Sequence, residues 1–313
     1  MLIAILFLAG GLLVLGTGAE LMVRGSSRLA LHFGISPLVV GLTIVAFGTS
    51  APELAVSVKA TLAGSSALAL GNVIGSNIAN IGLILGITAL LRPIRIEGQL
   101  VRIQLPLVIL SSILLGLLLL DGEITKFDGL ILISGLIGYL IFNFLNPSQS
   151  DLPEAVEEFN TRLAQSKVWL QVLIAIGGLG LLIGGSQLFV DGAISLARLF
   201  GVSEAVIGLT IVAIGTSVPE LATSLVAAFR GSSDIAIGNA IGSNLFNILA
   251  ILGVTGLVGN VSGDDFAPID FVVMTGFAAV LLPLAWSKMT LSRLEGAVLL
   301  GCYLAYLGYT ASA

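Results

Sequence analysis

The 313-residue sequence has little charge, one cysteine and one histidine. Only 10% of its residues are Asp, Glu, Lys or Arg, whereas 57% are hydrophobic, so it has too few polar side chains to cover a soluble domain. The single cysteine excludes an internal disulfide, and with a single histidine it supplies no Cys/His metal cluster. A net charge of −5 without a basic cluster argues against nucleic-acid binding. These shortages point to a chain embedded in a lipid bilayer.

Long apolar segments recur along the whole chain, and the mean hydropathy is +1.10. Each segment has about 20 residues, the length that a helix needs to cross a bilayer, and lacks the short alternating pattern of barrel strands. The first segment lacks the basic start and the cleavage site of a signal peptide, so it is counted as a span. We predict an all-α integral membrane protein with ten transmembrane helices, at 2–23, 36–62, 68–91, 103–120, 127–145, 168–198, 204–229, 235–258, 268–286 and 294–311.

Two stretches of the sequence occur twice. GLTIVAFGTSAPELAVS at 41–57 returns as GLTIVAIGTSVPELATS at 208–224, and GNVIGSNIANIGLILG at 71–86 returns as GNAIGSNLFNILAILG at 238–253. The two copies lie 167 residues apart in both cases (41 to 208 and 71 to 238), a distance that holds five predicted spans. Because five is odd, equivalent helices cross the membrane in opposite directions. The pattern predicts two inverted five-helix repeats with a site near the membrane midplane.

Lysine and arginine in the loops set the expected orientation. Ten of these side chains fall at one predicted face and three at the other, and the face with more of them is expected in the cytoplasm. Both termini are then extracytoplasmic, in a multi-pass protein of the cell membrane. We predict a first repeat at 1–145, a short cytoplasmic linker at 146–167 and a second repeat at 168–313.

One glutamate lies deep in a predicted span of each repeat. Glu53 and Glu220 are equivalent at the 167-residue offset, and an ionised side chain inside a bilayer is costly and usually functional. No lysine or arginine near them recurs in both repeats, which argues against a structural salt bridge. Two such carboxylates need protons or bound cations, so we expect Glu53 and Glu220 to bind cations.

The residues just before each glutamate supply further oxygen ligands. Pro52 and Pro219 lack an N–H, which frees the carbonyls of Gly48 and Gly215 four residues earlier. These glycines loosen the helix further, so carbonyls nearby can turn toward a ligand. Hydroxyls three and four residues before each glutamate share its helix face. Carboxylate, hydroxyl and carbonyl oxygens suit Ca²⁺ and Na⁺. The candidates are the hydroxyls of Thr49, Ser50, Thr216 and Ser217 and the carbonyls of Ala46 and Ala213.

A polar stripe follows along the next span of each repeat, in which every fourth residue carries an amide or a hydroxyl. Hydrogen bonding between helices without any ligand would also explain one such asparagine. A duplicated stripe that follows a duplicated glutamate favours cation binding. The stripes consist of Asn72, Ser76 and Asn80, and of Asn239, Ser243 and Asn247.

At these motifs the sequence resembles the sodium/calcium exchanger family of the cation/calcium antiporter superfamily. GTSAPE with GNVIGSNIAN, and GTSVPE with GNAIGSNLFN, match the two α-repeats of that family, and the resemblance covers essentially the whole chain. It implies an antiporter rather than an enzyme, without a cofactor or protein partner, that exchanges Na⁺ for Ca²⁺ by alternating access. The resemblance implies that the main ligands are Glu53 and Glu220, completed by Thr49, Ser50, Thr216, Ser217, Ser76, Ser243, Asn80, Asn247 and the carbonyls of Ala46 and Ala213.

The coupling ion stays open at this point. The two carboxylates carry a charge of −2, which one Ca²⁺, two Na⁺ or two H⁺ neutralise, so a proton/calcium exchanger is the main alternative. The hydroxyl and amide oxygens favour Na⁺, since a proton needs no coordination shell. In the potassium-dependent branch of the family, an aspartate at the position of Asn247 is associated with K⁺ use, so this asparagine argues against K⁺ dependence.

Two alternatives of other classes are disfavoured. An intramembrane hydrolase would need a base beside its serine, but His32 has no repeat partner and lies at a span end. A passive channel is disfavoured because inverted repeats with broken helices are typical of alternating-access transporters.

Overall fold

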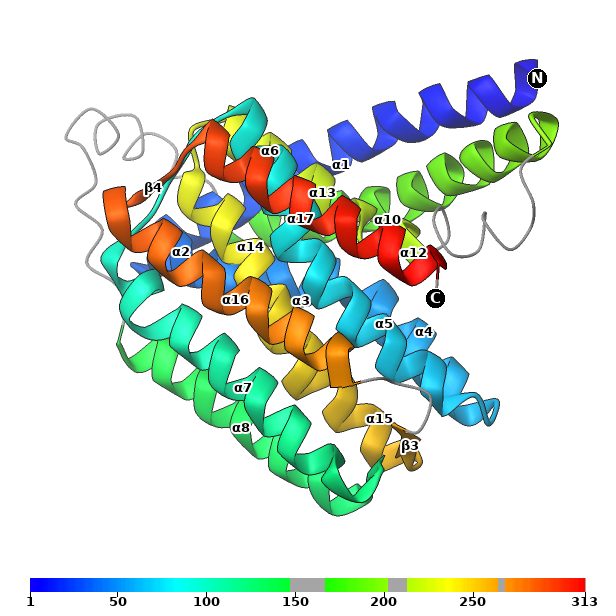
Figure 1. Ribbon diagram of the computed structural model, residues 1–313. Helices are drawn as coiled ribbons and strands as arrows, with labels where there is room; N and C mark the ends of the chain where they lie inside the picture. Colours follow the sequence, from blue (N-terminus) through cyan, green and yellow to red (C-terminus); the bar gives the residue numbers. More distant parts are fainter. Residues whose placement is uncertain (147–166, 202–212, 264–267, 313) are drawn as a thin grey trace. The chain divides into compact units, whose positions relative to one another are not determined.

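The structure is a computed structural model that describes residues 1–146, 167–201, 213–263 and 268–312. Within these ranges the chain is helical apart from turns and four two-residue strands (Figure 1). The helices are α1 (Leu2–Phe33), α2 (Pro37–Val40), η1 (Gly41–Val45), α3 (Ala46–Thr49), α4 (Ala51–Leu62), α5 (Ser66–Ala79), η2 (Asn80–Leu85), α6 (Gly86–Leu91), η3 (Leu100–Gln104), α7 (Leu105–Leu118), η4 (Leu119–Asp121), α8 (Lys126–Leu145), α10 (Val168–Leu199), α12 (Ala213–Gly215), α13 (Val218–Phe229), α14 (Ser233–Phe246), η6 (Asn247–Ile251), α15 (Leu252–Val258), α16 (Pro268–Lys288) and α17 (Arg293–Ser312). The strands are β1 (Ile94–Arg95), β2 (Glu123–Ile124), β3 (Val261–Ser262) and β4 (Thr290–Leu291).

Seven described helices are long and apolar enough to cross a membrane, and the bent pair Pro37–Thr49 and Ala51–Leu62 makes an eighth if it forms one span. The predicted span at 204–229 lies partly outside the described residues, as does nearly all of the predicted linker at 146–167. The helix α17 at the last predicted span is not among the seven. The protein is therefore a helical membrane protein, while the count of ten and the inverted topology stay predictions.

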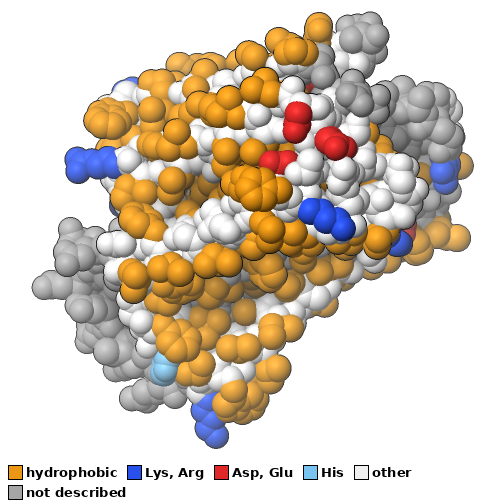
Figure 2. Space-filling view, turned by 90° about the horizontal axis from the view of Figure 1, so that it is seen from below, with side chains coloured by type: hydrophobic (Ala, Val, Ile, Leu, Met, Phe, Trp, Pro, Cys, Tyr) orange, Lys and Arg blue, Asp and Glu red, His pale blue; other side chains and the backbone are white. Residues whose placement is uncertain are grey.

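The surface that the structure describes is largely apolar. Figure 2 shows one face on which hydrophobic side chains far outnumber charged ones. Large apolar side chains are exposed along the long helices, among them Leu13 of α1, Leu110 of α7, Ile176 of α10 and Val272 of α16. Isolated exposed leucines are ordinary in soluble proteins, but extended apolar faces are not. A bilayer is the environment that such helices require.

The chain forms two compact units, each assembled from separate stretches of sequence. Unit 1 contains residues 1–49 and 144–239, and unit 2 contains residues 50–143 and 240–313. The chain passes from unit 1 to unit 2 between Thr49 and Ser50, and again within α14 after Asn239.

Unit 1 is built around the long helices α1 and α10, which run side by side in Figure 1. Glycines recur every seventh residue on both helices, at 11, 18 and 25 and at 178, 185 and 192. A Cβ at Gly18 would lie 2.7 Å from the backbone nitrogen of Leu182, and a Cβ at Gly185 would lie 2.8 Å from that of Leu15. The two backbones therefore touch, as small residues permit in membranes.

The helix α1 is longer than the predicted span at 2–23, because it continues to Phe33. The charged residues after position 23, which suggested that the span ends there, lie within the helix. Arg24 pairs with Glu20, and Arg28 donates to the side-chain oxygen of Gln171 at 3.3 Å. Polar side chains at this end of α1 therefore bond to one another and to α10 without ending the helix.

Unit 2 is built around the buried run of α5, η2 and α6, against which α17 and α16 pack. A Cβ at Gly296 of α17 would lie 2.7 Å from the backbone nitrogen of Leu90, so these helices also touch. Two short antiparallel ladders join loops of this unit: β1 pairs with β4 through Ile94 and Leu291, and β2 pairs with β3 through Ile124 and Val261.

Stretches of π-helix interrupt the helices of both repeats. In unit 2, η2 begins at Asn80 and η6 begins at Asn247, and these two asparagines are equivalent at the 167-residue offset. π-helical turns occur mostly as short insertions and frequently at functional sites. The two asparagines that the sequence placed among the ligands therefore mark the points where regular α-helix ends.

Candidate cation-binding site

The GTSxPE motif is a helix break in both repeats. The helix α3 ends at Thr49 and α4 begins at Ala51, while α12 ends at Gly215 and α13 begins at Val218. The residues between have nearly the same backbone angles, φ −83° and ψ 4° at Ser50 and φ −88° and ψ 3° at Ser217. The proline two residues after each serine lies in the first turn of the new helix, where its missing N–H costs least. The sequence predicted that the helix is loosened just before Pro52 and Pro219, and the structure shows that it is broken there.

Each glutamate lies in the first turn of the helix after the break. Glu53 is in the first turn of α4 and Glu220 in the first turn of α13, and each is only 1% exposed. The first backbone N–H groups of a helix have no partner within it, and its dipole favours negative charge at this end. A buried carboxylate still carries a large desolvation cost. The helix start reduces this cost, and a bound cation would offset it further.

In unit 2, Asn72 joins α5 to the helix that carries Glu53. Its Nδ2 donates to the backbone carbonyl of Glu53 at 3.2 Å and to Ser57 Oγ at 2.9 Å. Both bonds use the amide N–H groups. Asn72 therefore holds the first turns of α4, and with them the glutamate, against α5.

Unit 1 contains the equivalent arrangement around Glu220. Asn239 Nδ2 donates to the backbone carbonyl of Glu220 at 3.2 Å and to Ser224 Oγ at 3.1 Å. Its Oδ1 accepts a hydrogen bond from Thr49 Oγ1 at 3.0 Å. The fully buried Asn239 thus connects the start of α13 with the end of α3.

The rest of each polar stripe lies in unit 2. The helix α4, which carries Glu53, packs against α5, which carries Ser76, and against η6, which begins at Asn247. Ser76, Asn80, Ser243 and Asn247 are all at most 5% exposed. Within the described ranges, three of their oxygens have no hydrogen-bond partner: Asn80 Oδ1, Asn247 Oδ1 and Ser243 Oγ. Buried acceptors without a partner are rare and require an explanation, and a cation supplies one.

The hydroxyls of the GTSxPE motifs lie at the breaks. Thr49 Oγ1 lies 3.1 Å from the carbonyl oxygen of Val45, 3.3 Å from that of Ala46 and 3.0 Å from Asn239 Oδ1, and its one proton is available to these three acceptors. The Ala46 carbonyl is therefore one of three acceptors within reach of the Thr49 hydroxyl, and the most distant of them. Thr216 Oγ1 is buried and has no partner among the residues described. Ser50 and Ser217 are 4% and 2% exposed, and Ala213 is the first residue of α12.

Four buried polar residues beside the predicted ligands were not singled out from the sequence. They are Ser57 and Ser224, which accept from Asn72 and Asn239, and Asn77 and Asn244, which accept from Asn247 and Asn80. Each pair is separated by 167 residues. A systematic search for polar residues repeated at that offset would have identified all four.

The donor set of the described residues suits a hard cation. No group of three or more His, Cys, Asp or Glu lies close enough to hold a metal ion among them. In unit 2, one carboxylate, that of Glu53, is accompanied by neutral amide and hydroxyl oxygens; in unit 1, Glu220 is accompanied by Thr216 and Ser217. Such oxygen-rich sets suit Ca²⁺ and Na⁺ rather than soft metals.

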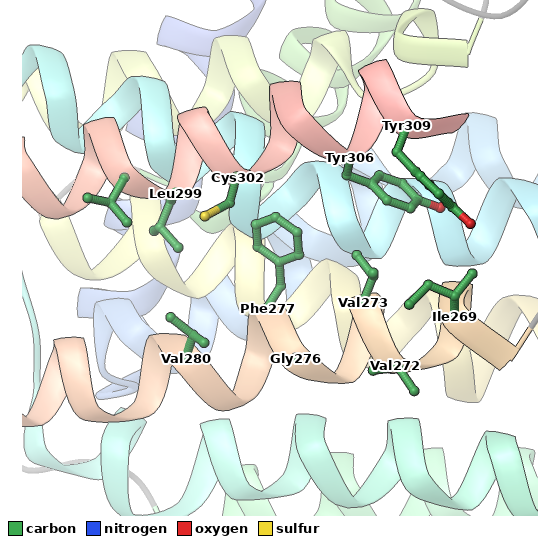
Figure 3. Close-up of a pocket in the computed structure, with 11 residues that line it drawn as sticks. Ile269, Val272, Val273, Gly276, Phe277, Val280, Leu299, Cys302, Tyr306 and Tyr309 are labelled. Carbon is green, nitrogen blue, oxygen red and sulfur yellow. The ribbon is translucent and has the colours of Figure 1, made fainter. Parts of the chain in front are cut away.

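Unit 2 also contains an apolar groove away from these residues. It is a groove of about 520 Å³ between α16 and α17 (Figure 3), lined by apolar side chains such as Val280, Phe277 and Leu299. At one end, Tyr306 donates to Asp270 at 3.0 Å. None of the predicted ligands lines this groove. Its lining has the character of a lipid-facing surface and not of a cation site.

Comparison with known proteins assigns the family. The model of the sodium/calcium exchanger protein family matches residues 3–145 and 170–311. The chain is 40% identical to the putative antiporter CaxA of Alkalimonas amylolytica, over 99% of this chain and 98% of that protein. It is 32% identical to the sodium/calcium exchanger MaX1 of Methanosarcina acetivorans, over 96% and 97% of the two chains.

The fold gives the same result. A solved structure of the sodium-calcium exchanger NCX_Mj, soaked with zero Na⁺ and Ca²⁺, superposes with a TM-score of 0.85 at 32% identity and covers 99% of both chains. The resemblance stated from the GTSxPE and GNxIGSN motifs is confirmed, and these relatives are transporters. This chain belongs to the sodium/calcium exchanger family.

Proposed function

We propose that this protein exchanges Na⁺ for Ca²⁺, with Glu53 and Glu220 as the charged ligands of the transported ions. The observation that carries the proposal is the duplicated placement of these residues: each is a buried glutamate in the first turn of a helix that follows a GTSxPE break. Burial alone disfavours the charge of a carboxylate in that place, and a bound cation would compensate for it.

The neutral ligands follow the two repeats. The unpartnered buried oxygens of Asn80, Asn247, Ser243 and Thr216 support their assignment, because cation coordination would satisfy them. Thr49 and its neighbour Ser50 lie at the first break, and Thr216 and Ser217 at the second. The full proposed ligand set is Glu53, Glu220, Thr49, Ser50, Thr216, Ser217, Ser76, Ser243, Asn80, Asn247 and the carbonyls of Ala46 and Ala213.

Charge neutralisation couples the two ion flows. One Ca²⁺ neutralises the two carboxylates, and so do two Na⁺. Either filling removes the charge that opposes a change of access through a low-dielectric barrier. The empty protein keeps a charge of −2 and resists that change. Ions therefore cross in exchange for one another, by alternating access.

The direction follows from the ion gradients. Under an inward Na⁺ gradient, the exchange exports Ca²⁺. We further propose ten spans in two inverted repeats, at 1–145 and 168–313, with both termini outside the cytoplasm. The names of MaX1 and NCX_Mj, which call both proteins sodium/calcium exchangers, support Na⁺ rather than H⁺ as the coupling ion.

The test is uptake of radioactive Ca²⁺ into proteoliposomes that contain the purified protein. Vesicles loaded with Na⁺ are compared with vesicles loaded with choline, each with and without a pH gradient. We expect Ca²⁺ uptake only into the Na⁺-loaded vesicles. Uptake driven by the pH gradient in choline-loaded vesicles would instead assign the protein to the proton-coupled branch, and uptake without any counter-ion gradient would indicate a channel.

A further inference from the structure

Four asparagines of unit 2 are joined in a crossed pattern that we call the amide clasp: Asn77, Asn80, Asn244 and Asn247. Asn80 Nδ2 donates to Asn244 Oδ1 at 2.9 Å, and Asn247 Nδ2 donates to Asn77 Oδ1 at 3.1 Å. All four are at most 2% exposed. Within each repeat, the acceptor lies three residues before the donor, so the two share a helix face.

The clasp has the same direction in both repeats. In each bond the donor is the first residue of a π-helical stretch, η2 or η6, and the acceptor lies in the last turn of the α-helix before the opposite π-helix. The remaining oxygens, Asn80 Oδ1 and Asn247 Oδ1, are buried and lack a hydrogen-bond partner among the described residues. Two amides on different helices thus hold their donors in the clasp and leave their acceptors unused.

The clasp sets the orientation of the Asn80 and Asn247 amides. A buried asparagine side chain is nearly two-fold about its last torsion, so its nitrogen and oxygen can exchange places. An unpartnered buried acceptor costs about 1–3 kcal/mol, and the clasp leaves two. Fixing the nitrogen of a planar amide also fixes its oxygen on the other side. A rotated amide would present N–H groups in its place, and these repel a cation.

We propose that Asn77 and Asn244 are positioning residues that hold the carbonyl oxygens of Asn247 and Asn80 in the orientation that binds the transported cation. They do not themselves bind it, because each already directs its own oxygen to the partner amide. Asn77 is further fixed by its Nδ2, which donates to Met274 Sδ of α16 at 3.6 Å. The inference rests on the proposed function, since it assigns Asn80 and Asn247 as ligands.

The role predicts that Asn77 acts only through Asn247. Asn77→Leu keeps the branched shape of the side chain, although leucine is larger, and removes the acceptor, which frees the Asn247 amide to rotate. Ca²⁺ binding should then weaken about tenfold, a typical coupling between residues in contact. In a protein that already carries Asn247→Ala, the same change should have no further effect. Asn244→Leu should behave in the same way toward Asn80→Ala.

A matched control exists in the same unit. Gln104 Nε2 donates to Asn143 Oδ1 at 2.7 Å, and both residues are fully buried. Asn143→Leu therefore also breaks a buried hydrogen bond between two side-chain amides on different helices, but neither of these two residues is a proposed cation ligand. It should lower the melting temperature as much as Asn77→Leu does, and leave the Ca²⁺ affinity unchanged.

The experiment is isothermal titration of Ca²⁺ into the purified full-length protein in detergent, for wild type, the single variants, the double variants and the control. Asn77→Ala and Asn77→Leu are both measured, so that one poorly folded variant does not decide the result. Weaker binding in the single variants, with no added loss in the doubles, supports the clasp. Unchanged affinity in folded single variants, or additive losses in the doubles, would overturn it while leaving the proposed function intact. Absence of Ca²⁺ binding by wild type would overturn the proposed function and, with it, the clasp.

Discussion

One added methyl group at each of two neighbouring glycines of α10 should change the stability of unit 1 in opposite directions. Gly178 faces α1: a Cβ there would lie 2.5 Å from the backbone nitrogen of Met22 and 2.7 Å from the carbonyl oxygen of Gly18. Gly177 is exposed, and a Cβ there meets nothing within 4 Å among the described residues. The pair isolates the α1–α10 contact, because the chemical change and the helix are the same.

The magnitudes follow from two opposing effects. Alanine is a better helix former than glycine, so Gly177→Ala should stabilise the protein by about 0.5–1 kcal/mol. Gly178→Ala has the same gain, but a contact below 3.0 Å with backbone atoms cannot be relieved by rotating a side chain. The two helices must move apart, and overpacking of this kind costs about 1–3 kcal/mol. We expect a net loss of roughly 1–2 kcal/mol.

The assay is thermal unfolding of the detergent-solubilised protein, followed by the size-exclusion peak that remains after heating. Gly177→Ala should unfold at or above the wild-type temperature, and Gly178→Ala a few degrees below it. Gly16→Ala and Gly18→Ala form the equivalent pair on α1, since Gly16 is open among the described residues and Gly18 is not. If Gly178→Ala were as stable as Gly177→Ala, the close approach of α1 and α10 would be refuted.

Two further predictions concern the candidate site. Asn247→Asp should keep Ca²⁺ binding but change the preference among monovalent ions, because a carboxylate replaces a neutral amide; unchanged Na⁺ and K⁺ dependence of Ca²⁺ uptake would rule this out. Asn239→Leu removes three hydrogen bonds, to Thr49, Glu220 and Ser224. It should lower the free energy of unfolding by about 2 kcal/mol, at roughly 0.5–1 kcal/mol for each bond, and a melting temperature equal to that of wild type would contradict the bonds.

Much of the site was predictable because the sequence repeats it. The 167-residue offset identified Glu53 and Glu220, and the prolines next to them predicted the helix breaks that the structure shows. Hydropathy located the long spans but placed the end of the first at 23, whereas α1 continues to Phe33. A window of hydropathy cannot detect that Arg24 and Glu20 neutralise each other on one helix face.

The hydrogen-bond pattern could not be predicted in the same way. The sequence grouped Asn72 and Asn239 with the other stripe residues, but the structure shows that they donate to the backbone carbonyls of Glu53 and Glu220. Which donor meets which acceptor depends on the relative rotation of two helices, and residue spacing along one helix does not determine it. The π-helical starts at Asn80 and Asn247 depend on packing for the same reason.

The most direct test of the proposed cation ligands measures Ca²⁺ uptake into Na⁺-loaded proteoliposomes by wild type, Glu53→Gln and Glu220→Gln, with Glu20→Gln as the control. Glutamine keeps the shape of the side chain and removes its charge. Glu20 is a glutamate outside the proposed site, paired with Arg24 and Arg230. We expect uptake by wild type and Glu20→Gln and none by Glu53→Gln or Glu220→Gln. Substantial uptake by either Glu53→Gln or Glu220→Gln would contradict the proposal.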